Sequence, residues 1–272
     1  MKISIATLTG NLRSVDMVHA LASLWRDAGR DVVCGTGFAA DADVCLLHQN
    51  RTRLDPAQIP PAPPGVAIVN GRVLDISKRR YSTLALDRGS DWGGAVIVKS
   101  NLNHFGLPET RGDRRRQTVA QWVRKKLFRN DWRRRRMLPH RDYPILDDLD
   151  EVPEWVWEEP DLLVEKFMPE RDGELFVLRG YVFLGSQSYG YRLFATHPMV
   201  KTGTMVRHDY IEEAPPEIVA QREELGFDFG KFDYVMRDGK AVLLDANRTP
   251  SFAGDPKSER FKRLATGIED FL

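Results

Sequence analysis

The order of the apolar segments near the N-terminus limits the fold of this chain more than any other feature. Residues 3–8 are a strand-like run, and residues 15–28 place their apolar side chains at the spacing of an amphipathic helix. Two further strand-like runs follow at residues 31–34 and 42–48. Short strands that alternate with a helix at this spacing are typical of parallel sheets. We therefore expect a parallel α/β unit in residues 1–75.

The C-terminal half instead carries strand-like runs joined by short turns. Residues 175–184 and 188–194 follow each other closely, and an Asp-Gly pair, typical of tight hairpin turns, separates residues 231–236 from residues 241–244. Connections this short predict antiparallel pairing, because a parallel neighbour needs a long crossover. The expected fold class is α/β, with parallel strands first and an antiparallel sheet with helices last.

Composition and cysteine content narrow the class of protein. Of the 272 residues, 42% are hydrophobic and 29% are charged, which is typical of soluble globular proteins. No apolar run approaches the ~20 residues that a membrane-spanning helix needs. Cys34 and Cys45 are too few for a disulfide framework and suit a reducing compartment, so we expect a cytoplasmic location. The oligomeric state stays open.

Charge is distributed very unevenly along the middle of the chain. Residues 111–136 contain twelve Lys or Arg and only two Asp, whereas residues 142–161 contain nine Asp or Glu and no Lys or Arg. The two segments could neutralise each other across the fold as ordinary solvated surface. The basic segment, which we expect to be helical over residues 113–129, could instead gather an anionic acceptor.

Three oxygen-bearing side chains near the end of the chain form a candidate metal site. Asp245 and Asn247 lie two residues apart at the end of one predicted strand, so they face the same side. Asp233 lies on the other strand of the predicted hairpin, and antiparallel pairing can bring it alongside them. Carboxylate and amide oxygens suit Mg²⁺, which takes its other ligands from water and nucleotide phosphates. Lys231 would share the face of Asp233 and could hold a phosphoryl oxygen.

Two earlier segments could complete a nucleotide site. Lys99 ends a strand-like run and precedes a polar loop, where it could bind a phosphate. The apolar strand that ends at residues 165–168 would leave backbone groups free for an adenine edge, with Phe167 and Met168 against the ring. Glu174 follows and could accept hydrogen bonds from ribose hydroxyls. Taken one at a time, each segment is better explained by an ordinary strand end or turn.

In order and spacing these pieces resemble the ATP-grasp superfamily. The matching pieces are Val96-Ile97-Val98-Lys99, Val164-Glu165-Lys166-Phe167 with Glu174, Gly230-Lys231-Phe232-Asp233-Tyr234 and Leu243-Leu244-Asp245-Ala246-Asn247-Arg248-Thr249-Pro250. They cover about residues 75–255, and residues 70–78 look like the junction before the nucleotide-binding domain. The resemblance implies an ATP-grasp fold in three parts. These are a Rossmann-like parallel α/β unit in residues 1–75, a small α+β subdomain with the basic helical insertion in residues 76–165, and a C-terminal subdomain with an antiparallel sheet and the metal site in residues 166–272.

The resemblance also implies ATP and Mg²⁺ as cofactors and a role for each candidate residue. Lys78 and Lys99 would contact phosphates, Glu165, Lys166, Phe167 and Met168 would hold the adenine, and Glu174 would bind the ribose. Lys231 would face the terminal phosphate, Arg192 is an additional candidate for a phosphate contact, and Asp233, Asp245 and Asn247 would hold one or two Mg²⁺.

Two positions depart from the pattern of the superfamily. The loop that covers the phosphates is usually rich in glycine, but residues 100–106 contain only Gly106. Asp245 stands where a glutamate is more usual. We therefore expect the loop to cover the phosphates differently and the metal geometry to be altered by the shorter side chain.

The resemblance implies a ligase that activates a small carboxylate as an acyl phosphate for attack by an amine or another nucleophile. Two alternatives remain open at this point. The first is a kinase that phosphorylates a hydroxyl of a sugar, polyol or lipid head group. The second is a non-catalytic module that binds a nucleotide or an anionic polymer through residues 111–136.

Overall fold

The structure is a computed structural model of the whole chain. It describes residues 1–106, 109, 122, 124, 126–139, 142–200, 203–211 and 213–272. Most of the predicted basic helix over residues 113–129 therefore lies outside the described residues. In the part of the chain that is described, no helix is long and apolar enough to cross a bilayer.

The N-terminal part is a parallel sheet, as the alternation of strands and helix predicts. Its strands follow the spatial order β2-β1-β3-β4, and every neighbouring pair is parallel. Their bounds are β1 (Lys2–Thr7), β2 (Asp31–Gly35), β3 (Val44–His48) and β4 (Ile68–Val69). Helix α1 (Met17–Asp27) buries Val18, Leu21 and Trp25, which lie on one face of the helix. The central strand β3 is buried along its whole length, as expected for an apolar run inside a parallel sheet.

The middle of the chain forms a smaller antiparallel sheet with the order β5-β8-β6-β7. Its strands are β5 (Ala85–Leu86), β6 (Val96–Ser100), β7 (Ile145–Leu146) and β8 (Leu162–Lys166). Helix α6 (Glu154–Glu158) packs on β8 through Trp155 and Val156, which are buried in the same cluster as Val96, Val98 and Val164. The acidic residues 142–161 therefore belong to a folded element that covers this sheet. Helix α5 (Trp132–Arg135) holds the end of the basic segment beside it, through a Trp132–Trp155 contact with ring centroids 5.9 Å apart.

The C-terminal part is a six-stranded antiparallel sheet with the order β12-β11-β10-β13-β14, and β9 pairs with β10. The strands are β9 (Glu170–Asp172), β10 (Leu175–Leu184), β11 (Gln187–Ala195), β12 (Met205–Ile211), β13 (Phe229–Arg237) and β14 (Lys240–Asn247). Helix α7 (Pro216–Glu224) covers one face, where Ile218 is buried against an aromatic cluster that includes Phe183, Phe227 and Phe232. The predicted hairpins are confirmed, but β9 and β12 were not anticipated, because β9 is three charged residues and the apolar residues of β12 are interrupted by the polar run at residues 207–209.

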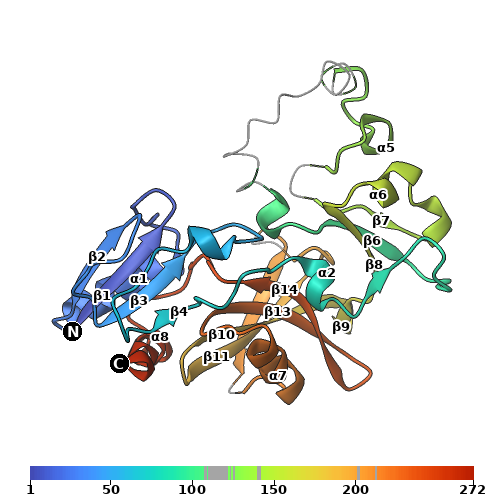
Figure 1. Cartoon of the computed structure of the whole chain (residues 1–272). Coiled ribbons are helices and arrows are strands. Elements are labelled where there is room, and N and C mark those ends of the chain that lie inside the picture. The colour runs from blue at the N-terminus through green and yellow to red at the C-terminus, as the bar shows by residue number, and fades with distance from the viewer. Residues whose placement is uncertain are drawn as a thin grey trace.

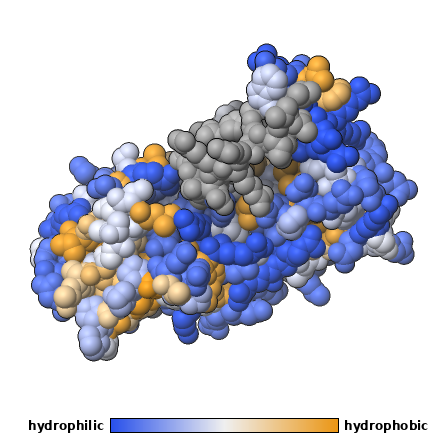
Figure 2. Space-filling view, turned by 45° about the horizontal axis from the view of Figure 1, so that its top comes forward, coloured by the Kyte–Doolittle hydropathy of each residue, from blue (hydrophilic) through white to orange (hydrophobic). Residues whose placement is uncertain are grey.

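The first and last segments of the chain pack together at one end of the elongated molecule (Figure 1). Helix α8 (Glu259–Thr266) lies against α1, and the indole of Trp25 donates a 2.8 Å hydrogen bond to the carbonyl of Ala265. Helix α8 ends at Thr266, and a 3-10 helix, η4 (Gly267–Phe271), follows it directly. The face seen in Figure 2 is largely hydrophilic, and its apolar patches are small and lie mainly towards the N-terminal sheet.

A buried asparagine joins the N-terminal sheet to the C-terminal sheet. Asn70 follows β4, has a positive φ of 63° and is fully buried. Its backbone N–H and side-chain amide donate to Asp228 Oδ2 and to the carbonyl of Phe229, both at 2.7 Å. Its Oδ1 accepts the backbone N–H groups of Asp228 and Phe229 at 3.0 Å. Asn tolerates this left-handed conformation better than most residues, so one residue satisfies both the turn and the contact.

Candidate functional site

The hairpin β13–β14 carries the predicted metal ligands side by side. Asp233 lies opposite Asp245, and Lys231 lies opposite Asn247. Residues opposite each other in an antiparallel pair share a face, so all four side chains lie on one side of the sheet. The register shifts directly after Asp233, as in a β-bulge, and such irregularities often re-aim side chains next to functional sites.

Two lysines reach these carboxylates from different parts of the chain. Lys231 Nζ lies 2.9 Å from Asp233 Oδ2, within β13 itself. Lys78, at the start of the short helix α2 (Lys78–Tyr81), places its Nζ 2.8 Å from Asp245 Oδ1. Lys78 is 4% exposed, so its charge is held by Asp245 in place of water.

A third ion pair lies across the small sheet. Lys99 on β6 places its Nζ 2.5 Å from Glu165 Oε2 on β8, and both residues are buried. The sequence predicted separate roles for the two residues, with Lys99 at a phosphate and Glu165 near the adenine. Antiparallel pairing places Ile97 opposite Glu165 and Lys99 opposite Leu163, which brings the two long side chains together.

Burial and neighbouring charge act in opposite directions on these groups. Burial acts to lower the pKa of Lys78, but Asp245 together with Tyr81 and Tyr143 outweighs it, so the pKa is raised. Burial likewise acts to lower the pKa of Lys231, and Asp233 together with Tyr191 and Asp245 raises it. Burial acts to raise the pKa of Asp245, but Lys78 together with Lys231 and Lys99 outweighs it, so the pKa is lowered. Burial raises the pKa of Asp233 in spite of Lys231, and the charge of Asp245 adds to the rise. An added cation would favour ionisation of both acids.

A cavity of about 280 Å³ opens beside these ion pairs. Its polar end is lined by Lys78, Lys99 and the three predicted metal ligands. Its other walls are largely apolar and come from both antiparallel sheets, with Leu84, Ile97, Lys166, Phe167, Met168, Val177, Leu178 and Leu244 among the lining residues. Lys166 Nζ lies 4.7 Å from the centre of the Trp92 ring, which holds its chain along the rim. An apolar slot that ends in charged groups is the shape that a nucleotide needs.

Four predicted residues do not line this cavity: Lys231, Glu165, Glu174 and Arg192. Lys231 and Glu165 contact it only through their ion-pair partners Asp233 and Lys99, which do line it. Glu174 is exposed in the turn between β9 and β10 and does not line the cavity. Arg192 pairs with Arg179 on the neighbouring strand, and Arg179 pairs with Tyr234 on the next, so these three side chains share one face of the sheet. Asp233 precedes Tyr234 and therefore points to the other face. The guanidinium of Arg192 is 3.4 Å from Asp209 Oδ2. The ribose contact suggested for Glu174 and the phosphate contact suggested for Arg192 stay predictions, and this geometry does not support them.

The structure adds cavity residues that sequence reasoning missed. Tyr143 lines the cavity, and burial raises its pKa to about 12. Its ring lies 4.7 Å from that of Phe105, in a loop where His104 and Phe105 both have positive φ. Asn103 from the same loop also lines the wall. No periodic pattern marks these positions, because they belong to loops whose places depend on the rest of the fold.

The residues present suit a divalent cation that arrives with a phosphate. Asp233 Oδ1 is buried and, among the described residues, has no hydrogen-bond partner. Asp233, Asp245 and Asn247 offer hard oxygen atoms on one face, as Mg²⁺ requires. No cluster of three or more His, Cys, Asp or Glu side chains that could hold a metal occurs in the described ranges. This donor set is therefore too sparse for a closed metal cage and needs ligands from another molecule.

Comparison with known proteins gives matches at the level of structure only. No protein-family model and no curated protein matches the sequence. A RimK domain ATP-grasp protein from Sphaerobacter thermophilus matches over 100% of this chain and 99% of its own, with a TM-score of 0.51 and 14% identity. A D-alanine–D-alanine ligase from Bacillus anthracis, complexed with ATP, covers 100% of this chain and 97% of its own, with a TM-score of 0.51 and 15% identity.

Two further matches are structures of complexes with a precursor. The macrocyclase MdnC from Microcystis aeruginosa, bound with precursor peptide MdnA, has a TM-score of 0.52 and 9% identity, and the match covers 100% of this chain and 99% of the other. The ATP-grasp ligase PsnB, complexed with a minimal precursor, has a TM-score of 0.53 and 13% identity over 99% of both chains. At these identities the matches define the fold, and the predicted fold class is confirmed.

Proposed function

We propose that this chain, whose fold is that of the ATP-grasp proteins, is an ATP- and Mg²⁺-dependent ligase that activates a carboxylate as an acyl phosphate. One observation supports this proposal above the others. Three lysine–carboxylate pairs from separate parts of the chain gather around one cavity, at 2.8 Å, 2.9 Å and 2.5 Å. Such pairs can be exchanged for phosphate–lysine and metal–carboxylate contacts without leaving a buried charge alone.

The nucleotide would lie along the apolar walls of the cavity. Phe167 and Met168 would pack against the adenine, while backbone groups that follow β8 would bind its edge. Lys78 and Lys99 line the polar end, where they would contact phosphate oxygens. Asp233, Asp245 and Asn247 would hold Mg²⁺ between the hairpin and the phosphates. When bound, the metal would neutralise phosphate oxygens and polarise the terminal phosphoryl group.

The reaction would proceed in two displacements. An oxygen of the substrate carboxylate attacks the terminal phosphorus of ATP, and the bond to ADP breaks. A nucleophile, such as an amine, then attacks the acyl carbon, phosphate leaves with the electron pair of the C–O bond, and the amine loses a proton. Lys231 would face the phosphoryl oxygens throughout, so the protein supplies positioning and charge, and no covalent intermediate on the enzyme is needed.

Binding of MgATP tests the nucleotide site without knowledge of the acceptor. Isothermal titration with Mg²⁺ and a non-hydrolysable ATP analogue should detect one site on the wild-type chain. Asp245→Asn removes one metal ligand and should weaken binding at least about tenfold, because loss even of groups that only support a metal ligand costs ~10–100-fold. The fold should be retained, since Asn keeps the shape of Asp.

Asp238→Asn is the matched control. Asp238 lies in the turn of the same hairpin, is exposed and has a positive φ of 49°, which Asn also tolerates. This variant should bind the analogue as the wild type does. Equal binding by Asp245→Asn and Asp238→Asn would remove the metal assignment.

Product analysis separates the ligase from the kinase alternative. With a panel of carboxylates and amines, a ligase releases ADP and free phosphate only when both classes of substrate are present. A kinase forms ADP but keeps the phosphate on a hydroxyl acceptor. Phosphate retained on an acceptor in this assay would replace the ligase proposal with the kinase.

A further inference from the structure

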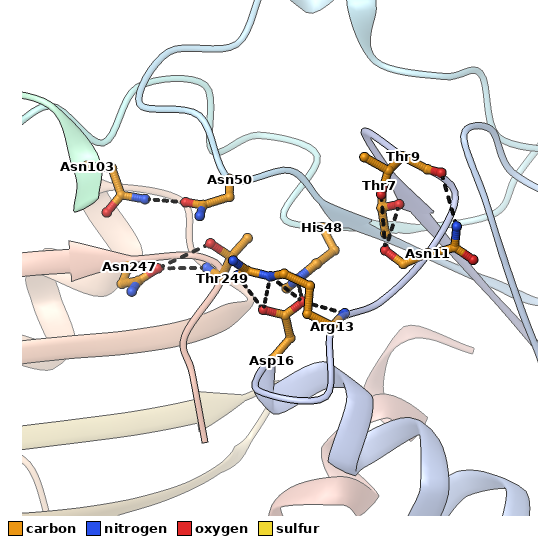
Figure 3. A network of polar contacts seen from close by, with 10 residues as sticks. All are labelled: Thr7, Thr9, Asn11, Arg13, Asp16, His48, Asn50, Asn103, Asn247 and Thr249. Atoms are coloured by element: carbon orange, nitrogen blue, oxygen red, sulfur yellow. Dashed lines mark hydrogen bonds and ion pairs between the residues drawn. The ribbon is translucent and has the colours of Figure 1, made fainter. Parts of the chain in front are cut away.

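A short segment of the N-terminal part reaches directly to the cavity. Residues 49–52, which we call the strap, follow β3 and run beside the cavity loop, residues 101–106 (Figure 3). Asn50 Oδ1 accepts a 2.7 Å hydrogen bond from the side-chain amide of Asn103. The hydroxyl of Thr52 accepts a 2.8 Å bond from the backbone N–H of Asn103. Asn103 lines the cavity, so the strap fixes one of its walls.

The strap is also tied to the linker, residues 73–77, which leads into Lys78. The backbone N–H of Ile76 donates to the carbonyl of Thr52 at 3.0 Å. Farther along, the backbone N–H of Lys78 donates to the carbonyl of Asn101 at 3.2 Å. The strap, the linker and the cavity loop therefore form one hydrogen-bonded unit that carries both Lys78 and Asn103.

Arg248 lies at the centre of this unit. It directly follows the predicted metal ligand Asn247 and is fully buried. Its Nε donates to the carbonyl of Gln49 at 3.0 Å, and its two terminal nitrogens donate to the carbonyls of Arg51 and Val73. Arg248 thus bonds the strap at two points and the linker at one. The guanidinium suits this task because its donors are fixed in a planar fork.

The charge of Arg248 is unusual for a purely structural residue. Within the described part of the chain it makes no ion pair with a carboxylate and bonds only to main-chain carbonyls. Burial lowers its pKa to about 10, against the weaker pull of Asp75 and Glu109, so it stays charged at neutral pH. A buried cation without a carboxylate is costly, and an apolar side chain could fill the same space. An apolar residue could not, however, make the three hydrogen bonds to the main-chain carbonyls of the strap and the linker.

We propose that Arg248 is a positioning residue of the nucleotide site, which holds Asn103 and Lys78 at the cavity through the strap and the linker. The proposal rests on the function proposed above. It explains how a cavity loop with a single glycine is kept in place: its shape comes from side-chain bonds to the strap, while His104 and Phe105 adopt positive φ. Two neighbouring residues at the end of β14 then have different tasks: Asn247 would bind the metal, and Arg248 would fix the cavity wall.

A double-mutant cycle on MgATP-analogue affinity tests this coupling. Arg248→Lys keeps the charge but cannot bridge three carbonyls, and it should weaken binding ~10-fold; Asn103→Ala should weaken it ~5-fold. If Arg248 acts through Asn103, the double variant should be much less than ~50-fold weaker, since residues in one network are not additive. Additive losses would overturn the proposed route through the strap.

Arg222→Lys is the matched control for a purely structural arginine. Arg222 also donates to three main-chain carbonyls, those of Phe227, Gly185 and Asp228, but it lies on helix α7 and does not line the cavity. Both lysine variants should lower the melting temperature. Only Arg248→Lys should also weaken MgATP binding. A loss of stability in Arg248→Lys with unchanged affinity would show that it is structural and overturn the proposal.

Hydrogen exchange separates failure of this inference from failure of the proposed function. Thr52→Val removes the hydroxyl that accepts the backbone N–H of Asn103 and keeps the shape of the side chain. This variant should therefore fold even if Arg248→Lys does not. Without nucleotide, the amides of residues 101–106 should exchange ~10-fold faster in both variants than in the wild type. If the wild type binds no MgATP, the proposed function fails, while the exchange rates still decide whether Arg248 and the strap position the loop. Unchanged exchange rates in both variants would refute the positioning role of Arg248 and the strap.

Discussion

Two polar clusters, one at the cavity and one where the N-terminal and C-terminal sheets meet, differ in how their polar groups are paired. The cavity cluster, made of Lys78, Lys231, Asp233 and Asp245, consists of ion pairs and keeps a buried carboxylate oxygen without a partner among the described residues. The junction cluster, made of Asn70 and Arg248 with their partners, directs its side-chain donors to main-chain carbonyls. A cluster of exchangeable pairs can accept a charged ligand, whereas a cluster bonded to the main chain can only fix geometry.

The comparison predicts that the clusters respond differently to substitution and to MgATP. Changes in the junction cluster should lower stability, and at Arg248 they should also weaken MgATP binding, so that ligand adds less stability to such a variant than to the wild type. Changes in the cavity cluster should alter ligand binding, and any stability lost should be partly restored by ligand, because binding to the native state alone adds to its stability.

The largest effect is expected at Asn70. Asn70→Ala removes all three side-chain bonds to Asp228 and Phe229, leaves buried backbone groups unsatisfied and places Ala at a positive φ. We expect a loss of about 4 kcal/mol in the free energy of unfolding, measured by urea denaturation. Asp238→Ala is the control: it shares the positive φ but is exposed, so it should cost only about 1 kcal/mol. Similar losses in the two variants would mean that the junction bonds contribute little.

A smaller and ligand-sensitive loss is expected at Glu165. Glu165→Gln leaves the buried Lys99 without its carboxylate, and breaking a buried pair costs about 3 kcal/mol. Saturating MgATP should raise the melting temperature of this variant more than that of the wild type, because a phosphate can take the place of the carboxylate. Thermal unfolding with and without MgATP measures the difference. An equal ligand-induced shift in both proteins would place Lys99 outside the phosphate site.

The smallest effect is expected at Asp16 and depends on pH. Burial acts to raise its pKa, but bonds from His48 and Arg13 outweigh it and lower the pKa far below the ordinary value (Figure 3). For an acid with a lowered pKa, the stabilising contribution is present above about pH 4, the unfolded value, and is lost as the pH falls below it. Between pH 5 and pH 2.5 the wild type should therefore lose on the order of 1 kcal/mol more stability than Asp16→Asn.

Asp27→Asn is the control for this pH dependence, since Asp27 is exposed on the same helix. Denaturant unfolding at each pH should give this variant the wild-type slope. The same slope in Asp16→Asn would show that the Arg13–Asp16–His48 contacts do not contribute to acid stability.

The sequence by itself determined the hairpin and which of its polar side chains share a face. Alternation within β13 and β14 and the Asp-Gly turn fix which side chains share a face, so Asp233, Asp245 and Asn247 could be grouped before any tertiary contact was known. The parallel character of residues 1–75 followed for the same reason, because it depends on local periodicity and connection length.

Only the tertiary structure decided which groups meet across long separations in the chain. Lys78 reaches Asp245, and Arg248 reaches Gln49, across segments whose spacing in sequence carries no periodic signal. It also placed Arg192 on the sheet face opposite to Asp233. This follows from the register of β11 with β10 and of β10 with β13, which the sequence of any one strand does not reveal. The physical reason is that local patterns set the direction of a side chain within its element, whereas its partners depend on how the elements pack and on which buried charges must find a counterpart.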